Sequence, residues 1–522
     1  MIQALGVLGF VLLVQIPPPQ AASELASALR AERQALRAKE TAQLEAVASR
    51  LDTEGKKPDA SEVRSRIEPA PPLNGPTIFK PMPEVIAPAR GLANVPAAGL
   101  KWRAEVQGIR TQSAKDLFSL AQQAANAKRF ALADDCLRAV LVRQPDHAEA
   151  RRLLGFVPYN GGWATPYAAK KLKDGEVKHP EFGWVPADWV AHLDKGELPA
   201  PIQERGQKPA WIPADQADAL RQNWENAWQI STEHFRISTN VPMSEAIAFG
   251  RQIEAFHDLF FSVMADVIGP DLPLAKRFAD PKKVARPSEK PHLVCYFASK
   301  DEFVQDLAPK LGENIAQSLG VYIMPREAKA LGQRNRAWKD PKSYFYRDAG
   351  GQLPITATLY HEVSHQLLFE SASDSRIDLN NGNYWVFEGL GTYFETLEAG
   401  PDGELLLGGL GSKRIQVALV RLVRQKEFIP ISELVNMSKA RFNAIQAGDV
   451  HLNYAEANAL AVFLMQFDDG RYRDDFLDYV RFAYQGRGSS HALNTLLGVP
   501  YSRLDEQVLA FLKEGLEKAQ PK

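Results

Sequence analysis

The chain has 522 residues, of which 45% are hydrophobic, and this allows at least one sizeable core and several structural segments. Its 62 lysines and arginines balance 63 aspartates and glutamates, so no overall field favours nucleic acid or an anionic membrane as a partner. Two cysteines, Cys136 and Cys295, cannot form the disulfide framework of a small secreted scaffold, and neither has metal-ligand spacing. Partners must therefore be inferred from a local site.

The first 22 residues have the pattern of a secretory signal peptide. Residues 1–16 form an apolar run shorter than the roughly 20 residues of a membrane helix, and prolines and alanines follow it. No basic residue precedes the run, and a retained anchor on a lipid surface is the alternative. No other run approaches membrane-spanning length, so we expect an exported protein, periplasmic or extracellular, with no integral membrane span.

Three N-terminal segments follow. Residues 23–57 predict a charged amphipathic helix, and the proline-rich residues 58–98 are expected to run extended as a linker. Residues 99–155 predict two packed helices that resemble a single tetratricopeptide-like unit. Because a solenoid needs about three repeats, an accessory hairpin is favoured over a peptide-binding solenoid. This N-terminal helical region is a candidate surface for a protein partner.

The rest of the chain predicts a connector and one larger domain. Residues 156–225 are rich in glycine and tryptophan and indicate a loop-rich connector, whereas residues 226–520 carry longer periodic segments. Beyond residue 353 the pattern is almost wholly helical. The fold class is therefore α+β, with a small mixed β-sheet ahead of a mostly helical C-terminal half. The elements predicted before residue 353 are strands over 234–239, 292–298 and 319–324 and helices over 244–268 and 301–311.

A His-Glu-x-x-His motif, His361 to His365, lies within the helical pattern of residues 359–368. Histidines at i and i+4 emerge from one side of a helix and can reach one tetrahedral cation, which predicts a zinc site. Glu362, beside the first ligand, can address a water molecule at the metal.

Glu388 is the predicted third ligand. It lies 23 residues after His365 in an apolar segment, where an unpaired carboxylate would be costly and a cation would compensate it. Gly389 and Gly391 remove side-chain bulk and would let this second helix approach the first closely. Glu395 and Glu398 compete for the third position, and Glu395 could instead orient a ligand from outside the coordination sphere.

With a downstream Glu-Gly-x-Gly on a second helix, the chain resembles the gluzincin zinc metallopeptidases, over roughly residues 230–520, and is similar to the peptidase-MA-like branch of bacterial exported proteins. The resemblance implies His361, His365 and Glu388 as ligands and Glu362 as general base. In aminopeptidase-like members a tyrosine at a comparable distance stabilises the oxyanion, and Tyr454 is the candidate here, with packing on the core as the alternative and His451 as the substitute.

These residues predict a zinc-dependent hydrolase that cleaves peptide bonds in a peptide or protein substrate. The strand over 320–324 could pair with an extended substrate at the sheet edge. The competing hypothesis is a catalytically silent exported scaffold that keeps a gluzincin core and binds partners, although the intact Glu362 argues against it. Hydrolysis of a non-peptide amide would use the same metal chemistry.

Overall fold

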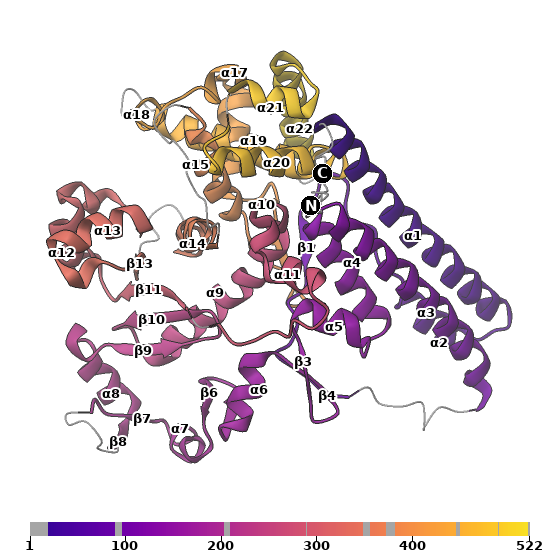
Figure 1. The fold of residues 1–522 in the computed structure, drawn as a ribbon, viewed down its shortest axis with the longest axis horizontal. Helices are drawn as coiled ribbons and strands as arrows, with labels where there is room; N and C mark the ends of the chain where they lie inside the picture. The colour runs from indigo at the N-terminus through magenta and orange to yellow at the C-terminus, as the bar shows by residue number, and fades with distance from the viewer. Residues whose placement is uncertain are drawn as a thin grey trace, which may run out of the picture.

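The structure is a computed structural model that describes residues 19–88, 97–202, 209–288, 290–347, 355–371, 382–444, 449–488 and 490–519. Apart from its last residues, the predicted signal peptide lies outside this part. Within it, no helix combines the length and the apolar character needed to cross a membrane. The α+β class is confirmed, because small sheets accompany a predominantly helical chain whose C-terminal half is mostly helix (Figure 1).

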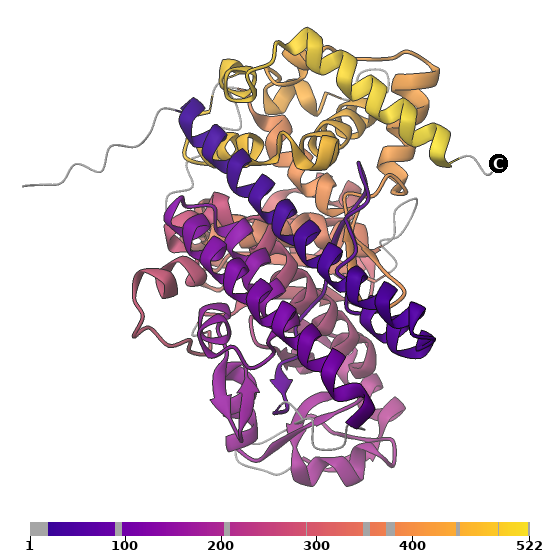
Figure 2. The same ribbon diagram turned by 90° about the vertical axis from the view of Figure 1, so that its right-hand side faces the viewer.

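Long helices lie side by side in the N-terminal region (Figure 2). The first packs on the third through a small apolar cluster that also includes the second, and the third forms a hairpin with the fourth. Two salt bridges, Arg30–Asp474 at 2.5 Å and Arg129–Asp478 at 2.9 Å, join this region to the C-terminal helix α20 (Arg473–Tyr484). The N-terminal helices are α1 (Pro19–Thr53), α2 (Lys57–Arg64), α3 (Ala97–Asn126), α4 (Phe130–Arg143) and α5 (Ala148–Leu154).

The expectation of an extended linker over residues 58–98 is wrong for its beginning. Helix α2 starts there because Pro58 occupies the first turn, where the missing N–H removes no helical hydrogen bond. Further on, β1 (Thr77–Phe79) pairs with β15 (Leu405–Leu407) in the C-terminal half, and β2 (Val85–Ile86) pairs with β4 (Gly162–Ala164). The segment is therefore tied to the fold at both strands rather than acting as a free spacer.

The connector forms small antiparallel pairs with short helices between them. Strand β4 lies between β2 and β3 (Val157–Tyr159), β5 pairs with β6, and β7 pairs with β8. Its other elements are α6 (Pro166–Lys173), β5 (Glu176–His179), β6 (Gly183–Pro186), α7 (Val190–Leu193), β7 (Glu197–Pro199), β8 (Trp211–Pro213) and α8 (Ala214–Arg221).

The largest sheet is mixed and has the strand order β12-β13-β11-β10-β9. The central strand β11 runs parallel to both neighbours, while the outer strands β9 and β12 are antiparallel to theirs. Strands β10, β11 and β12 lie where strands were predicted; β9 and β13 were not predicted. The bounds are β9 (Trp228–Ser231), β10 (Phe235–Thr239), β11 (His292–Phe297), β12 (Gly320–Ile323) and β13 (Lys342–Tyr346).

Helices cover both faces of this sheet. Strand β11 is therefore buried on both sides, which explains why its sequence is a continuous apolar run. Val294 and Tyr296 face the main core, whereas Cys295 and Phe297 face a second cluster formed with α12 (Lys300–Leu311) and α13 (Pro325–Arg334). Cys295 is buried, as expected, and burial raises the pKa of its thiol to about 11. On the main-core side lie α9 (Met243–Val263) and α14 (Ile355–Ser371), and α10 (Ala265–Ile268) and α11 (Pro273–Ala279) follow α9.

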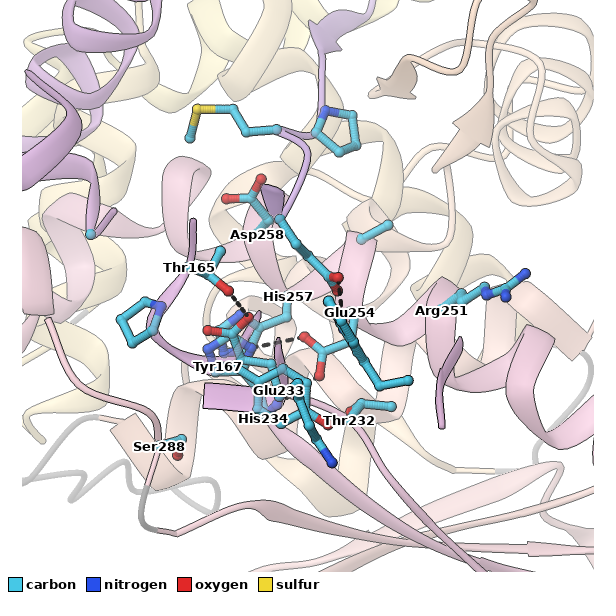
Figure 3. A pocket seen from close by; sticks show the side chains of 18 of the residues that line it. Thr165, Tyr167, Thr232, Glu233, His234, Arg251, Glu254, His257, Asp258 and Ser288 are labelled. Atoms are coloured by element: carbon cyan, nitrogen blue, oxygen red, sulfur yellow. Dashed lines mark hydrogen bonds and ion pairs between the residues drawn. The ribbon is translucent and has the colours of Figure 1, made fainter. Parts of the chain in front are cut away.

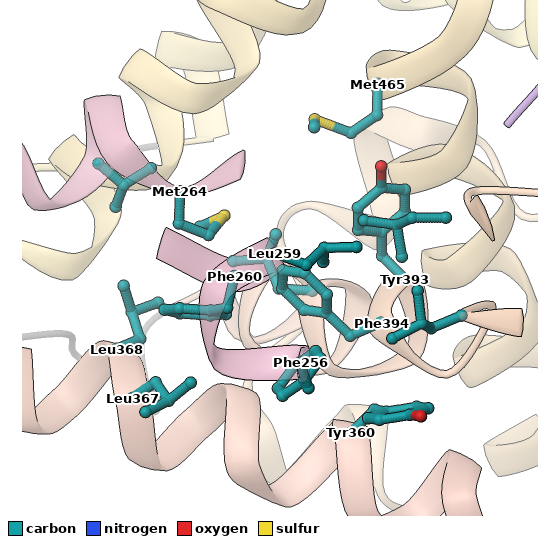
Figure 4. Packing of buried hydrophobic residues seen from close by; sticks show 14 of the residues in the cluster. Phe256, Leu259, Phe260, Met264, Tyr360, Leu367, Leu368, Tyr393, Phe394 and Met465 are labelled. Carbon is teal, nitrogen blue, oxygen red and sulfur yellow. The ribbon is translucent and has the colours of Figure 1, made fainter. Parts of the chain in front are cut away.

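The main core holds the helix with the His-Glu-x-x-His motif against its neighbours (Figure 4). Phe256 and Phe260 of α9 lie between Tyr360 and Leu367 of α14 on one side and Phe394 of α15 on the other. The remaining C-terminal elements are α15 (Tyr384–Phe394), β14 (Glu398–Ala399), α16 (Lys413–Ala418), the π-helix η6 (Leu419–Arg424), α17 (Ile431–Leu434), α18 (Lys439–Phe442), α19 (Asp449–Gly470), α21 (Ser490–Leu497) and α22 (Tyr501–Ala519).

A buried acid on α19 makes stability depend on pH. Glu456 is 2% exposed, accepts the Ile429 N–H at 3.0 Å, and has its pKa raised by burial to about 9. The unfolded chain releases this proton near pH 4.5, so the folded state binds the additional proton between pH 4.5 and about 9. Stability therefore falls as pH rises through this window, by about 1.4 kcal/mol per unit.

Glu456→Gln keeps the acceptor and removes the titration. We expect the Tm of the variant to rise relative to wild type as pH increases from 5 to 9, measured by thermal unfolding at each pH. Exposed Glu313 is the control, and Glu313→Gln should shift the Tm equally at every pH. A Glu456→Gln difference that does not change with pH would contradict the prediction.

Candidate metal centre

The two motif histidines lie on one face of α14. Helix α14 packs on β12 and β13 and against α15, and both side chains are buried. Their rings are 4.8 Å apart between centroids and nearly perpendicular, at 84°. His365 also stacks on Phe387 of α15, with centroids 3.7 Å apart. The i, i+4 spacing therefore places the two buried imidazoles side by side.

Glu388 reaches the same point from α15. Its Oε2 is 3.2 Å from Nε2 of His361, and one potential ligand atom from each of His361, His365 and Glu388 lies within 4.8 Å of the others. The structure thus brings the three predicted ligands together as a buried group that could bind a metal. Glu398, a weighed alternative, is exposed on β14.

Close approach of the two helices depends on Gly391. A Cβ atom at this position would lie 2.6 Å from the His361 ring, which is closer than real Cβ contacts. Gly389 instead faces α19, where a Cβ would be 3.1 Å from the Ala457 carbonyl oxygen. The two glycines therefore serve different helix contacts, and only Gly391 opens space toward α14.

The donor set fits a divalent cation. Nε2 of His365 is buried and has no hydrogen-bond partner in the described part of the chain, which is an unusual cost unless a ligand satisfies it. Burial and the neighbouring His361 lower the pKa of His365 to about 3, so this ring is neutral, the form that binds metals. Burial opposes charge on His361 too, but its bonds to Glu388 and Glu395 raise its pKa to about 10. The carboxylates thus stabilise a positive charge here, which a metal ion would supply in place of the proton.

Glu395 orients His361 from the side away from Glu388. Its Oε1 accepts the Nδ1–H of His361 at 2.8 Å, which leaves Nε2 toward the metal centre. Its other oxygen accepts a hydrogen bond from Arg414 on α16, and this guanidinium lies 5.2 Å from the ring centroid of Tyr454. Arg414 was not predicted from the sequence, because no motif or spacing links it to the histidines.

Glu362 lies on α14 next to the histidines and faces β12. Its Oε2 accepts the N–H of Tyr322 at 2.9 Å. Burial raises the pKa of Glu362 to about 7, the charge on His361 opposes this shift, and Glu388 adds to it. The predicted general base is therefore a half-buried carboxyl that exchanges a proton near neutral pH.

Two tyrosine hydroxyls lie on the Glu388 side. Tyr384 donates to Oε1 of Glu388 at 2.5 Å, and Tyr454 donates to Oδ1 of Asn443 at 3.3 Å. Burial raises the pKa of Tyr454 well above its usual value, and the charge of Glu388 adds to the shift. Tyr454 therefore lies within electrostatic reach of the candidate ligand, whereas His451, the substitute, is exposed at the start of α19. Tyr384, one turn before Glu388 on the same helix face, was missed, although its spacing of four could have indicated it.

Comparison with known proteins adds one match. Residues 355–487 match the family described as "Protein of unknown function (DUF1570)". The matched segment runs from the start of α14 to just beyond α20 and contains His361, Glu362, His365, Glu388 and Tyr454. No curated protein and no solved structure matches the chain.

Proposed function

We propose that the chain is a zinc-dependent hydrolase, namely an exported metallopeptidase of the gluzincin type. The observation that carries this proposal is the convergence of two buried imidazoles and one buried carboxylate within 4.8 Å, with Glu362 adjacent. Two histidines and a glutamate form a three-ligand set typical of catalytic zinc, which leaves a position for water or substrate.

His361, His365 and Glu388 would hold the ion, which when bound supplies Lewis-acid chemistry that acidifies water and polarises a carbonyl. Glu362 takes the proton of the attacking water and returns it to the leaving amine nitrogen, a role suited to a carboxyl that titrates near neutral pH. Tyr454 donates its hydroxyl hydrogen to the oxyanion that develops on the scissile carbonyl. Glu395 keeps Nε2 of His361 directed at the ion.

The outer strand β12 supports a peptide as substrate. It pairs only with β13 among the described residues, and the N–H of Tyr322 points from its outer edge to Glu362. An extended peptide added at this edge would form main-chain hydrogen bonds and lie next to the general base. Because recognition would use the main chain of the substrate, it would tolerate many different side chains in that substrate.

Metal removal tests the proposal. We expect chelation to abolish hydrolysis of a denatured protein mixture and zinc to restore it, whereas magnesium, which prefers oxygen ligands in octahedral geometry, should not. Hydrolysis is measured as release of new amino termini. Unchanged hydrolysis after complete metal removal would contradict the proposal.

Glu395→Gln should weaken zinc binding at this centre by about 10–100-fold, because the amide loses the charge that holds the His361 Nδ1–H and pairs with Arg414. The measurement is the free zinc concentration, set by a chelator buffer, that gives half-maximal hydrolysis. Glu427, which pairs with Arg421 at 2.6 Å on the surface, is the matched control. Equal zinc requirements for Glu395→Gln and Glu427→Gln would show that Glu395 does not position the ligand.

A further inference from the structure

A cavity in the described part of the chain is separate from the candidate metal centre. It has a volume of about 1000 Å3 and lies between α4, the connector, β9 and α9. None of His361, His365 and Glu388 lines it. Its walls instead carry a second group of metal-ligating side chains, His234, Glu254 and His257 (Figure 3).

The ligand atoms of this second group also lie close together. His234 lies just before β10, and Glu254 and His257 lie three residues apart on α9, so two elements supply the donors. One potential ligand atom from each residue lies within 4.8 Å of the others. The two imidazoles face each other, with ring centroids 3.7 Å apart and planes at 14°. All three residues are partly exposed to the cavity.

The hydrogen bonds leave nitrogen atoms available for a ligand. Oε2 of Glu254 lies 2.8 Å from Nδ1 of His234, so Nε2 of that ring remains. Neither ring nitrogen of His257 has a hydrogen-bond partner in the part of the chain that the structure describes.

His292 and Glu233 lie near the three proposed ligands but are not among them. His292 is 6.1 Å from His257 between ring centroids and its Nδ1 lies 2.6 Å from Glu370 of α14, but it has no ligand atom within 4.8 Å of all three donors. Glu233 lines the same cavity and accepts a hydrogen bond from Thr165 at 3.1 Å. Burial raises the pKa of Glu233 to about 7, so its carboxyl adds the negative potential that favours a cation over an anion in this part of the cavity only as pH rises above neutral.

We propose that His234, Glu254 and His257 form a second binding site for a divalent cation of the zinc class. Two imidazoles and a carboxylate are the donor set that such ions prefer, and the cavity leaves an open coordination position. Binding turns the two rings out of their stack so that their nitrogens converge, and the cavity supplies the space. The ion then joins the start of β10 to α9.

Another histidine in the chain is bound to a carboxylate and stacked on an aromatic ring, but it does not belong to a candidate metal site. Nδ1 of His192 lies 2.6 Å from Glu197, and its ring stacks on Trp211 with centroids 4.1 Å apart. A carboxylate-bound, stacked histidine is thus present there, but the second imidazole is replaced by an indole, which cannot coordinate a metal. His192→Ala therefore serves as the control, because it removes a stacked histidine that has no second imidazole beside it.

The test is zinc stoichiometry of the full-length chain, measured by mass spectrometry of the metal after equilibration with zinc and desalting. We expect two equivalents in wild type and in His192→Ala, one in His257→Ala, and one in His361→Ala/His365→Ala. The triple variant should bind none. Cobalt provides a second readout, because visible absorption bands of the double variant with Co2+ should disappear when His257 is also replaced.

Thermal unfolding with and without zinc checks that the variants are folded, and zinc should raise the Tm of the double variant but not of the triple variant. The proposal is overturned if the folded double variant binds no zinc, or if replacing His257 in that variant leaves zinc and the cobalt spectrum unchanged. Loss of zinc only on replacing His257 would instead contradict the first centre, so the two proposals fail separately.

Discussion

Glu362→Gln is expected to lower the rate of peptide hydrolysis by about 10²–10⁴-fold while zinc content stays at the wild-type level. The amide keeps the size of the side chain and an oxygen that can accept the Tyr322 N–H, so the contact between α14 and β12 is preserved. It cannot take a proton from water. The rate is measured on a denatured protein mixture, and zinc content is measured on the same sample.

Glu370→Gln is the matched control for this variant. Glu370 is also on α14 and also contacts Tyr322, whose hydroxyl donates to it at 3.3 Å, but it lies at the C-terminal end of the helix, five residues after His365. The control should retain the wild-type rate per folded molecule. Equal rates for Glu362→Gln and wild type would remove the enzymatic proposal and favour the alternative of a silent scaffold that retains the gluzincin core.

Glu388→Ala is expected to lose one equivalent of zinc per chain and, with it, hydrolysis. A direct ligand contributes more to zinc affinity than an outer-shell partner does, and loss of an outer-shell partner costs about 10–100-fold in affinity. The loss of zinc affinity in Glu388→Ala should therefore exceed that in Glu395→Gln. The truncation also removes the acceptor for Tyr384 and leaves the buried His361 without the carboxylate 3.2 Å away. Zinc content and hydrolysis are measured together.

Glu398→Ala serves as the control because Glu398 is an exposed acid on β14 only ten residues further along the chain. Its zinc content should equal that of wild type. Unchanged zinc in Glu388→Ala, relative to the Glu398→Ala control, would show that another group completes the site.

Much of the core fold followed from local patterns. The apolar run of β11 and the spacing of α9 predict a strand and a helix because each residue's burial repeats with the period of its element. Strands β9 and β13 escaped prediction. Their short runs gain stability only from neighbours far away in the chain, as in the parallel pairing of β13 with β11.

The proline-rich segment also has structure that depends on distant parts of the chain and that local patterns did not predict. Proline content excludes long helices, and the prediction of an extended chain rested on that alone. Pairing of β1 with β15 across more than 300 residues is set by contacts that no local pattern contains. Helix α2 forms because its proline lies in the first turn and because Ala60 and Val63 are buried in the cluster shared with α1 and α3.

The sequence by itself determined the chemistry available at the candidate centre. Helical periodicity places His361 and His365 on one face and Glu362 beside them, because 3.6 residues complete a turn. Only the tertiary structure decided which acid meets them. Glu388 of α15 and Glu395, the residue that follows this helix, lie about two turns apart on the same face, and the packing of α15 on α14 at Gly391 sets one against Nε2 and the other against Nδ1 of His361. Arg414 and the His234 group depend on contacts between elements, which are set by the packing of the whole chain and not by local spacing.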